Sequence, residues 1–217
     1  ELGLDPLGSD YEYAAQVADG LAYILANAHA VPVPVHPAGD PDTNSNGIGL
    51  YFNQSSCGSY HDIYNSAIAM MASAGSGPPE LYTTTLQDAI DYMAWAQADD
   101  YCGIHRGGWR YQPGCDTDNS NAGYVTLGLG FAEGPPPFGF GLNVPQFVKD
   151  ELNLWIDVIQ DDVNGDTNDG GSWYTPHSSW VNILKTGNLV FEMVLVGDNS
   201  ATPRLQDAID YIERHWF

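Results

Sequence analysis

Positive charge is scarce in this chain of 217 residues. It has 6 lysine and arginine residues against 28 aspartate and glutamate residues, so the formal net charge is −22. Nucleic-acid backbones are bound by clustered cations, and the composition therefore excludes unaided binding to nucleic acid. A surface of acids and neutral polar groups is typical of secreted or cell-surface proteins, and also of proteins in high salt. Of these two settings we favour an extracellular or cell-surface location.

Long apolar runs are missing as well. No stretch approaches the roughly 20 apolar residues that a membrane-spanning helix requires, so we expect no membrane span. Hydrophobic residues nevertheless make up 43% of the chain and aromatic residues 12%. These values exclude the low-hydrophobicity composition of a disordered acidic chain, and the length is sufficient to bury a core without cross-links.

Cysteine is limited to Cys57, Cys102 and Cys115. Their spacing matches neither a CxxC redox motif nor a zinc knuckle. Our hypothesis is one disulfide, between Cys102 and Cys115, and one spare thiol. Asn53, followed by Gln and Ser, lies in the only N-x-S/T sequon of the sequence and is a glycosylation site if the protein is secreted.

The heptapeptide LQDAIDY occurs twice, at residues 86–92 and 205–211. Seven identical positions at an offset of 119 residues indicate an internal repeat. A glycine–aromatic signature marks a unit of about half that length: Gly49-Leu-Tyr51, Gly108-Trp109 and Gly171-Ser-Trp173. A helical pattern precedes and follows each signature. The predicted repeat is therefore a helix, an acidic loop, a glycine–aromatic turn and a second helix.

The predicted helices are of two kinds. The first helix of each unit carries apolar side chains at the 3.6-residue period of an amphipathic helix. The second helix is apolar nearly all round, which predicts a place in the interior. The first helices cover residues 10–29, 86–98 and 145–160, and the second helices cover residues 60–74, 120–133 and 179–196. We therefore expect an outer wall of first helices around an inner wall of second helices.

The predicted fold class is all-α, an array of helical hairpins with about seven helices in a single domain over residues 1–217. Its parts are repeat 1 (about 9–75), repeat 2 (about 84–134), repeat 3 (about 143–197) and a terminal helix (about 203–216). A β fold is disfavoured because alternation with period two is confined to short stretches such as Val31–His36. Proline at every second position there predicts a polyproline-like loop.

Residues 107–130, GGWRYQPGCDTDNSNAGYVTLGLG, carry a more specific pattern: GGW-x-Y, a short loop with Asp and Ser, and then an apolar helix. This pattern resembles the repeat of the prenyltransferase and squalene-cyclase superfamily. Residues 51–72 and 170–195 resemble it more loosely. The resemblance implies an α/α toroid, in which hairpins surround an axis with the second helices inside. Three and a half hairpins would form an arc or a smaller closed ring.

The resemblance also implies sites that can be checked residue by residue. Class II terpene cyclases protonate their substrate with a DxDD acid, and Asp116-Thr-Asp118-Asn119 occupies a comparable place, with Asp118 as the candidate acid. The last Asp of the motif is Asn119 here, and the next residues are equally typical of a helix cap. The zinc ligands of protein prenyltransferases are incomplete, since Asn121 stands at the His position and His61 has no Asp-x-Cys partner. We therefore expect no zinc.

Two acidic loops place side-chain oxygens at alternate positions. The first has Asp40, Asp42, Asn44 and Asn46, and the other has Asp162, Asn164, Asp166 and Asn168. A third, shorter series is formed by residues 116–120. Calcium takes six to eight oxygen ligands, and loops of this kind supply them, so we predict calcium binding. Asp, Asn and Gly are also the residues of turns and N-caps, which is the alternative interpretation.

Aromatic side chains recur after the glycine of the signature, at Trp109, Tyr111, Trp173 and Tyr174. They serve either as wedges between hairpins or as surfaces that stack on sugar rings. Our leading interpretation is a non-catalytic structural or recognition module that self-associates or binds other surface components and is stabilised by calcium. One alternative is a toroid enzyme, terpene-cyclase-like or a polysaccharide lyase, with Asp118 as acid. The other is a carbohydrate-binding module that uses the repeated aromatic residues.

Overall fold

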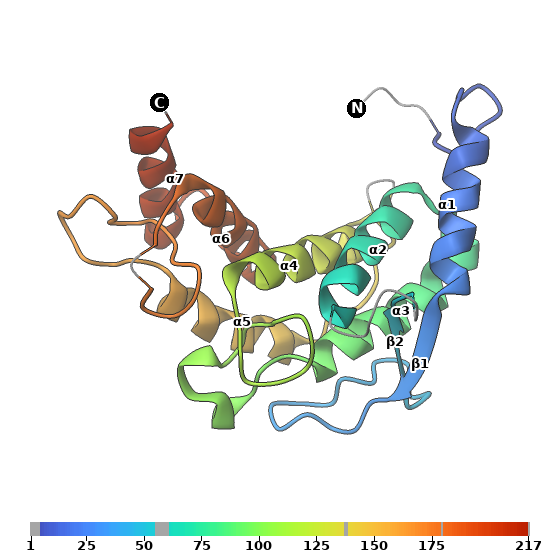
Figure 1. Cartoon of the computed structure of the whole chain (residues 1–217), viewed down its shortest axis with the longest axis horizontal. Helices are drawn as coiled ribbons and strands as arrows, with labels where there is room; N and C mark the ends of the chain where they lie inside the picture. The colour runs from blue at the N-terminus through green and yellow to red at the C-terminus, as the bar shows by residue number, and fades with distance from the viewer. Residues whose placement is uncertain (1–4, 55–60, 137–138, 179, 217) are drawn as a thin grey trace.

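The computed structural model describes residues 5–54, 61–136, 139–178 and 180–216. In chain order the elements are α1 (Ala14–Ala26), β1 (Ala28–Pro32), β2 (Ile48–Phe52), α2 (Asp62–Ser76), α3 (Pro79–Trp95), a 3-10 helix η2 (Asp100–His105), α4 (Asn119–Glu133), α5 (Gln146–Ile159), α6 (Ile183–Val196) and α7 (Pro203–His215) (Figure 1). The fold is thus mainly helical, as the sequence predicts, with one small hairpin. None of the helices in the described ranges combines the length and apolar character needed to cross a membrane.

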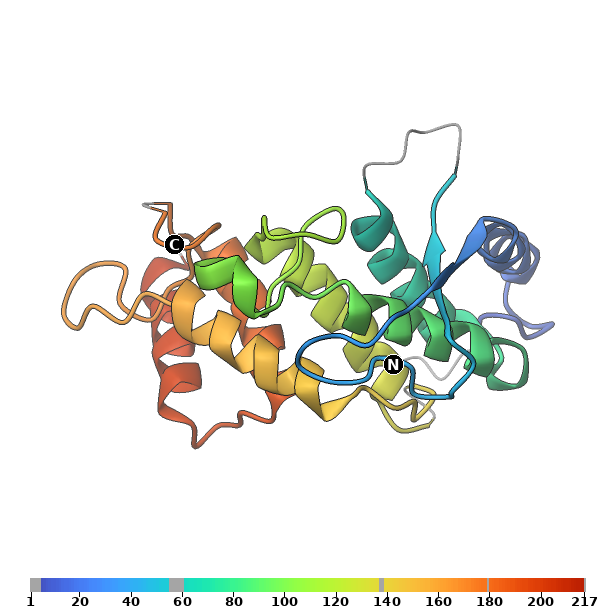
Figure 2. The same cartoon turned by 90° about the horizontal axis from the view of Figure 1, so that it is seen from below.

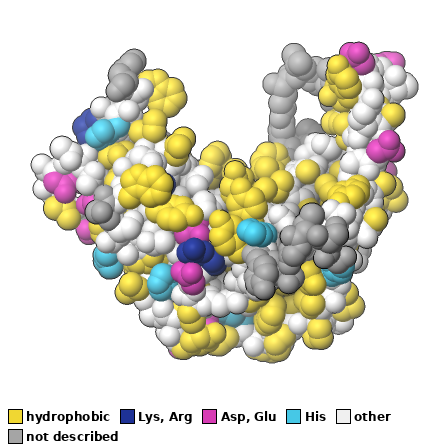
Figure 3. Space-filling view, in the orientation of Figure 1, with side chains coloured by type: hydrophobic (Ala, Val, Ile, Leu, Met, Phe, Trp, Pro, Cys, Tyr) yellow, Lys and Arg dark blue, Asp and Glu magenta, His cyan; other side chains and the backbone are white. Residues whose placement is uncertain are grey.

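The helices lie in two layers (Figures 1 and 2). Helix α2 packs against α4, and α4 packs against α6, so the second helices of the three predicted units form one inner layer. Helix α3 packs against α2, and both α5 and α7 pack against α6. Helices α1 and α7 stand at opposite ends of the molecule. The described chain therefore forms an arc, which is hollowed on the side between these two ends (Figure 3).

The core lies between the layers, but one side of the inner layer is open. Ile63 and Met70 of α2 and Met193 of α6 are fully buried. In contrast, Phe191 is 50% exposed and Val194 is 56% exposed, so the expectation that α6 is buried all round is wrong in part. The inner helices are covered by outer helices on one face only. Their other face borders the hollow of the arc, and apolar side chains there remain in contact with solvent.

The two copies of the heptapeptide occupy equivalent places. Gly49 lies against Tyr92 of α3, and Gly171 lies against Tyr211 of α7, where an added Cβ would come within 3.0 Å of each tyrosine. These tyrosines are the last residues of the two LQDAIDY segments. Gly108 makes the same approach to Trp155 of α5. Each glycine–aromatic segment therefore docks on the next outer helix, although the first lies in strand β2 and not in a predicted turn. Glycine is needed at each place because a side chain would collide with that helix.

The segment Val31–His36 departs from its predicted conformation. Its first residues belong to β1, which pairs antiparallel with β2 in the register Val31 to Gly49 and Pro32 to Ile48. The prediction of a polyproline-like loop is thus wrong for Val31 and Pro32, and His36 forms an isolated antiparallel bridge with Gly39. Pro32 is tolerated because it stands at the last position of a strand with one neighbour. The partner strand lies far along the chain, so local alternation could not indicate the pairing.

Candidate ligand-binding site at the ends of the inner helices

The N-terminal ends of α2, α4 and α6 lie along the same edge of the molecule, which is the upper edge in Figure 2. Two of these ends are capped by side chains. Asp118 Oδ1 accepts a hydrogen bond from the Asn121 backbone nitrogen (2.9 Å), and Asn182 Oδ1 accepts one from that of Leu184 (3.1 Å). Such caps satisfy the free N–H groups of the first turn. The loops that lead into the inner helices bring aromatic residues to this edge.

A series of aromatic rings, which we call the aromatic row, follows this edge. Its members are His61, Tyr64, Tyr111, Tyr124, Tyr174 and Trp180. In the first part, ring centroids lie 4.6 Å apart for His61 and Tyr111, 6.0 Å for Tyr111 and Tyr64, and 4.8 Å for Tyr64 and Tyr124. The hydrogen bond with Tyr124 and burial raise the pKa of Tyr64 to about 12. Its phenol therefore keeps its proton to a higher pH than an ordinary tyrosine does.

The second part of the row lies over α6 and is linked to α4. The Tyr174 and Trp180 ring centroids are 5.8 Å apart, and Trp180 is 62% exposed. The Tyr174 hydroxyl lies 3.3 Å from Ser120 Oγ in the first turn of α4. Ser120 in turn donates to Asp118 Oδ1 (2.6 Å). The hydroxyl groups of Tyr174 and Ser120 thus lie at the junction between this pair of rings and α4. Figure 3 looks onto this face, where hydrophobic, cationic, acidic and histidine side chains gather.

Charged groups flank the row at Arg110. Its Nε lies 3.1 Å from Asp118 Oδ2 and its Nη1 lies 3.1 Å from Asp116 Oδ1. The guanidinium also lies 5.7 Å from the centre of the Tyr111 ring, within cation–π range. Arg110 thus holds the loop before α4 against the start of that helix.

Asp118, the candidate cyclase acid, is engaged on both oxygens. It is fully buried, and it accepts hydrogen bonds from Ser120, from the Asn121 backbone and from the Asn121 side chain, in addition to its pairing with Arg110. A general acid must reach the atom that it protonates. These contacts are those of a helix N-cap, which is the second reading that the sequence offers for this loop.

Lys185 lies in the first turn of α6, beneath the aromatic row. Its side chain is buried, and its Nζ lies 3.5 Å from the centre of the Trp180 ring and 5.9 Å from that of Tyr174. Burial lowers the pKa of this ammonium group. Lys185 could not be identified from the sequence, because a single lysine in an apolar helix carries no signal of its own.

The four predicted stacking residues have different places. Tyr111 and Tyr174 belong to the aromatic row. Trp109 does not, because it is only 1% exposed and its Nε1 donates to the Met93 carbonyl (2.9 Å). Its assignment as a sugar-stacking residue is therefore wrong, and it acts as a wedge in the core. Trp173 is half-buried and contacts the His177 ring at 5.0 Å, outside the row.

Tyr64, Tyr124 and Trp180 were not identified from the sequence as binding residues. Tyr64 and Tyr124 lie near the starts of α2 and α4, within helices whose composition predicts burial. Tyr64 is two residues from the start of α2 and Tyr124 is five residues from the start of α4, so no shared spacing marks them in the sequence. Trp180 lies just before α6, in a loop whose course the sequence alone does not predict.

The first acidic loop is organised by hydrogen bonds of its own. Asp42 accepts from the backbone nitrogens of Asn46 (3.1 Å) and Gly47 (2.7 Å). The side-chain amides of Asn44 and Asn46 both donate to Asp88 Oδ1 of α3, at 2.6 and 2.9 Å. Asp40 Oδ1 accepts from the Asp42 backbone. Turn hydrogen bonds and docking on α3 thus account for the alternation, and calcium binding stays a prediction.

The other acidic loop is more exposed. Asp166 Oδ1 accepts from the backbone nitrogens of Asn168 (2.6 Å) and Asp169 (2.9 Å), while Asp162 and Asn164 lie at the surface. Within the described ranges, no three His, Cys, Asp or Glu side chains gather closely enough to hold a metal ion. Asparagine and carbonyl oxygens also bind calcium, so this finding leaves the calcium hypothesis for either loop to experiment.

Cys102 and Cys115 form a disulfide that joins η2 to the loop before α4. Cys57 lies outside the described residues. Asn53 is only 7% exposed, and its side-chain nitrogen donates to Asp62 Oδ1. N-glycosylation adds a bulky group to that same nitrogen, which requires an exposed position. The folded protein therefore offers no accessible acceptor at Asn53, and we do not retain it as a glycosylation site.

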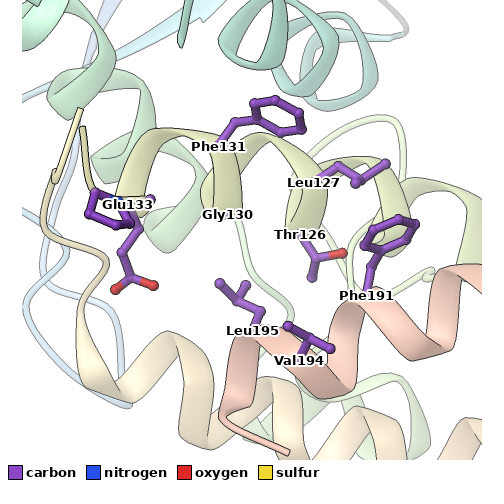
Figure 4. Close-up of a pocket in the computed structure, with 10 residues that line it drawn as sticks. Thr126, Leu127, Gly130, Phe131, Glu133, Phe191, Val194 and Leu195 are labelled. Atoms are coloured by element: carbon purple, nitrogen blue, oxygen red, sulfur yellow. The ribbon is translucent and has the colours of Figure 1, made fainter. Parts of the chain in front are cut away.

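An apolar pocket of about 590 Å³ lies between α4 and α6 (Figure 4). Leu127 and Phe131 reach it from α4, and Phe191 and Val194 reach it from α6. Glu133 at its margin is paired with Lys149 Nζ at 2.7 Å. The pocket offers apolar surface but no free acid–base pair.

Comparison with known proteins adds no relative. No family model, curated protein or solved structure matches this chain. Arguments about function therefore rest on the geometry of the site.

Proposed function

We propose that the protein is a non-catalytic, extracellular or cell-surface recognition module that binds a glycan chain along the aromatic row. The observation that carries the proposal is the row itself, a group of four rings and a pair of rings at one edge of the inner helices, the pair being linked to α4 through the contact of Tyr174 with Ser120. Sugar rings offer apolar C–H faces and peripheral hydroxyls. Aromatic rings with polar tips match both features, and tyrosine and serine hydroxyls lie between them here.

The row is also a favourable surface in energetic terms. Tyrosine and tryptophan present large, rigid surfaces with few rotatable bonds. Ligand binding therefore restricts few side-chain torsions, and its cost in conformational entropy is small. Contacts with Tyr111 and Tyr124 hold Tyr64, and the contact with Ser120 holds Tyr174. This preorganisation favours binding of an extended chain across several rings.

An enzyme on the same scaffold remains the alternative function. A terpene-cyclase-like reaction would need Asp118 as a free acid, but its oxygens are already engaged. A polysaccharide lyase would use the row to hold its substrate, and it would release unsaturated products that absorb near 235 nm. An assay of that absorbance with the polymers tested below distinguishes lyase activity from recognition alone.

The scaffold is part of the proposal. We assign the arc to a prenyltransferase- and squalene-cyclase-like toroid, supported by the alternation of outer and inner helices and by the GGW-x-Y turn at residues 107–111. A structure of this protein determined by experiment, together with any flanking chain, tests whether the hairpins close into a ring.

Self-association of the module is a further part of the proposed function. The apolar pocket between α4 and α6, with Phe131 40% exposed and Phe191 50% exposed, is the surface that a second copy would cover. Sedimentation velocity at several protein concentrations, with and without calcium, measures the association. We expect Phe131→Ser with Phe191→Ser to shift the protein to monomer, and a monomeric wild-type protein contradicts this part.

The binding proposal is tested by affinity electrophoresis with immobilised soluble polysaccharides. Trp180→Ala and Tyr174→Ala should each weaken binding by up to about tenfold, since an aromatic contact contributes about 0.5–1.5 kcal/mol beyond its buried area. Tyr101→Ala and Trp216→Ala are the matched controls, because these residues are 76% and 66% exposed and lie outside the row. Equal losses in all four variants, or no binding to any polysaccharide, would refute the proposal.

A further inference from the structure

Lys185 is unusual among the cations of this protein. The residue is 6% exposed, and its Nζ has no hydrogen-bond partner among the described residues. It also stands in the first turn of α6, where the helix dipole presents its positive end and disfavours a cation. A buried ammonium without an anion is unfavourable. Only the faces of Trp180 and Tyr174 compensate it in the described structure.

The other five cations all have polar partners. Arg106 pairs with Glu151, Arg110 with Asp116 and Asp118, Lys149 with Glu133, Arg204 with Asp157 and Asp198, and Arg214 donates to the Asp169 carbonyl. Acidic residues outnumber basic ones by 28 to 6, so most cations meet a carboxylate. Lys185 is the exception, and it is the cation that lies under the aromatic row.

We propose that Lys185 receives a carboxylate of the bound chain, so that the ligand is an acidic, uronate-containing polysaccharide. The inference rests on the glycan-binding function proposed above and names its ligand class. The ammonium lies next to two members of the row, Trp180 and Tyr174, and close to the capped N-terminus of α6. A carboxylate at this place gains a cation, a nearby phenol and the positive end of a helix together.

Trp180 covers the ammonium in the structure. Its ring centre is 3.5 Å from Nζ, while the residue itself is 62% exposed. A carboxylate can reach Nζ only if this ring turns aside, and the ion pair then replaces the cation–π contact that the ring gives up. Binding of the acidic chain should therefore change the environment of the Trp180 indole.

The net charge of −22 does not oppose this contact at close range. Repulsion between the protein and an acidic polymer is screened beyond about 8 Å at physiological ionic strength. The contact at Lys185 is shorter than that and is shielded from solvent. The preference for an acidic chain should therefore be visible at 0.15 M salt and above.

The test compares two forms of one polymer, polygalacturonate and its fully methyl-esterified form, by affinity electrophoresis and isothermal titration. We expect wild-type protein to bind the acidic form at least tenfold more tightly. Lys185→Met should remove this preference and keep binding to the neutral form. Lys149→Met is the control, because this lysine is paired with Glu133 outside the row, and it should behave as wild type. Circular dichroism melts verify that both variants are folded.

Each outcome separates this inference from the proposed function. Equal binding of both forms by the wild type, or a preference that survives in Lys185→Met, overturns the uronate inference while the glycan-binding function stands. Binding of neither form overturns the uronate inference, and the glycan-binding function falls as well only if no other polysaccharide binds.

A second measurement uses wild-type protein and does not depend on the behaviour of Lys185→Met. The chain has two lysines, so ¹³Cε-lysine labelling gives two lysine signals, which Lys149→Met assigns. Titration with trigalacturonate should move the Lys185 signal and leave the Lys149 signal in place, with a parallel change in tryptophan fluorescence. A Lys185 signal that does not respond at saturating trigalacturonate would sink the inference.

Discussion

Gln97 and Gln160 make the same pair of hydrogen bonds at the ends of successive outer helices. Gln97 Nε2 donates to the carbonyls of Gly107 (2.9 Å) and Val148 (3.1 Å). Gln160 Nε2 donates to those of Gly170 (3.2 Å) and Arg204 (2.9 Å). Each glutamine therefore joins its own glycine–aromatic turn to the start of the next outer helix. Two successive repeats are thus cross-linked at equivalent positions.

The first prediction concerns these glutamines. Gln97→Leu and Gln160→Leu each remove two buried hydrogen bonds, one to a glycine carbonyl and one to a carbonyl in the first turn of the next outer helix, and such a loss costs about 1–3 kcal/mol. We expect each variant to lower the free energy of unfolding by that amount in urea denaturation. Gln146→Leu is the control, since Gln146 is exposed and bonds only to Asp150 of its own helix. A control loss equal to that of the two buried glutamines would contradict the bridging role.

The second prediction separates wedge tryptophans from binding tryptophans. Trp109 is buried and hydrogen-bonded, so Trp109→Ala should lower the free energy of unfolding by about 3–5 kcal/mol. Trp180 is largely exposed, and Trp180→Ala should change it by about 0.5 kcal/mol or less. Urea denaturation measures both. Similar losses in the two variants would mean that Trp180 is part of the core and not of a ligand surface.

The third prediction concerns pH. Burial raises the pKa of Asp91 to about 6, although it accepts hydrogen bonds from Thr43. Since the folded-state pKa lies above the unfolded one, its contribution is full below the unfolded pKa of 3.8 and is lost as pH rises through about 6. The melting temperature should therefore rise as pH falls from 7 to 4.5, and Asp91→Asn should flatten this rise.

The control for the pH experiment is Asp116→Asn, whose side chain is 70% exposed. Acidification reduces charge repulsion in the wild type and in both variants. The difference between the Asp91→Asn profile and the other two therefore isolates the contribution of the buried carboxyl. An Asp91→Asn profile that runs parallel to wild type would show that another group governs this range.

The fourth prediction concerns calcium. If the loop of Asp40, Asp42, Asn44 and Asn46 binds the ion, calcium should raise the melting temperature, EDTA should lower it, and magnesium should do little, because magnesium is smaller and demands a stricter octahedron. Asp42→Ser should abolish the response. The same melt with and without EDTA decides the matter, since an unchanged curve removes calcium from the description of both loops.

Much of the helical fold was accessible from the sequence. The amphipathic period over residues 145–160 predicted α5 to within a residue or two, and the apolar run at residues 120–133 predicted α4. Helix α3 begins at Pro79, earlier than expected, because Pro78 and Pro79 start the helix before its apolar period becomes visible. The β1–β2 pairing was missed because it depends on contacts between distant segments.

Only part of the candidate site could be predicted from the sequence. Tyr111 and Tyr174 were selected because they follow the repeated glycine, but Trp109 shares that signature and is buried. The difference lies in which way each side chain leaves the turn. Trp109 points toward α3, where its indole finds the Met93 carbonyl. No spacing in the sequence records that direction.

The sequence by itself determined the alternation of outer and inner helices, because the period of apolar residues sets which face of each helix leaves water. It also determined where the turns fall, since glycine is required where a turn meets the next helix. Only the tertiary structure decided which aromatic rings remain exposed and that Lys185 Nζ has no hydrogen-bond partner among the residues that the structure describes. Those features depend on the distances between segments far apart in the chain, and the energy of a charge or a ring depends on its neighbours in space.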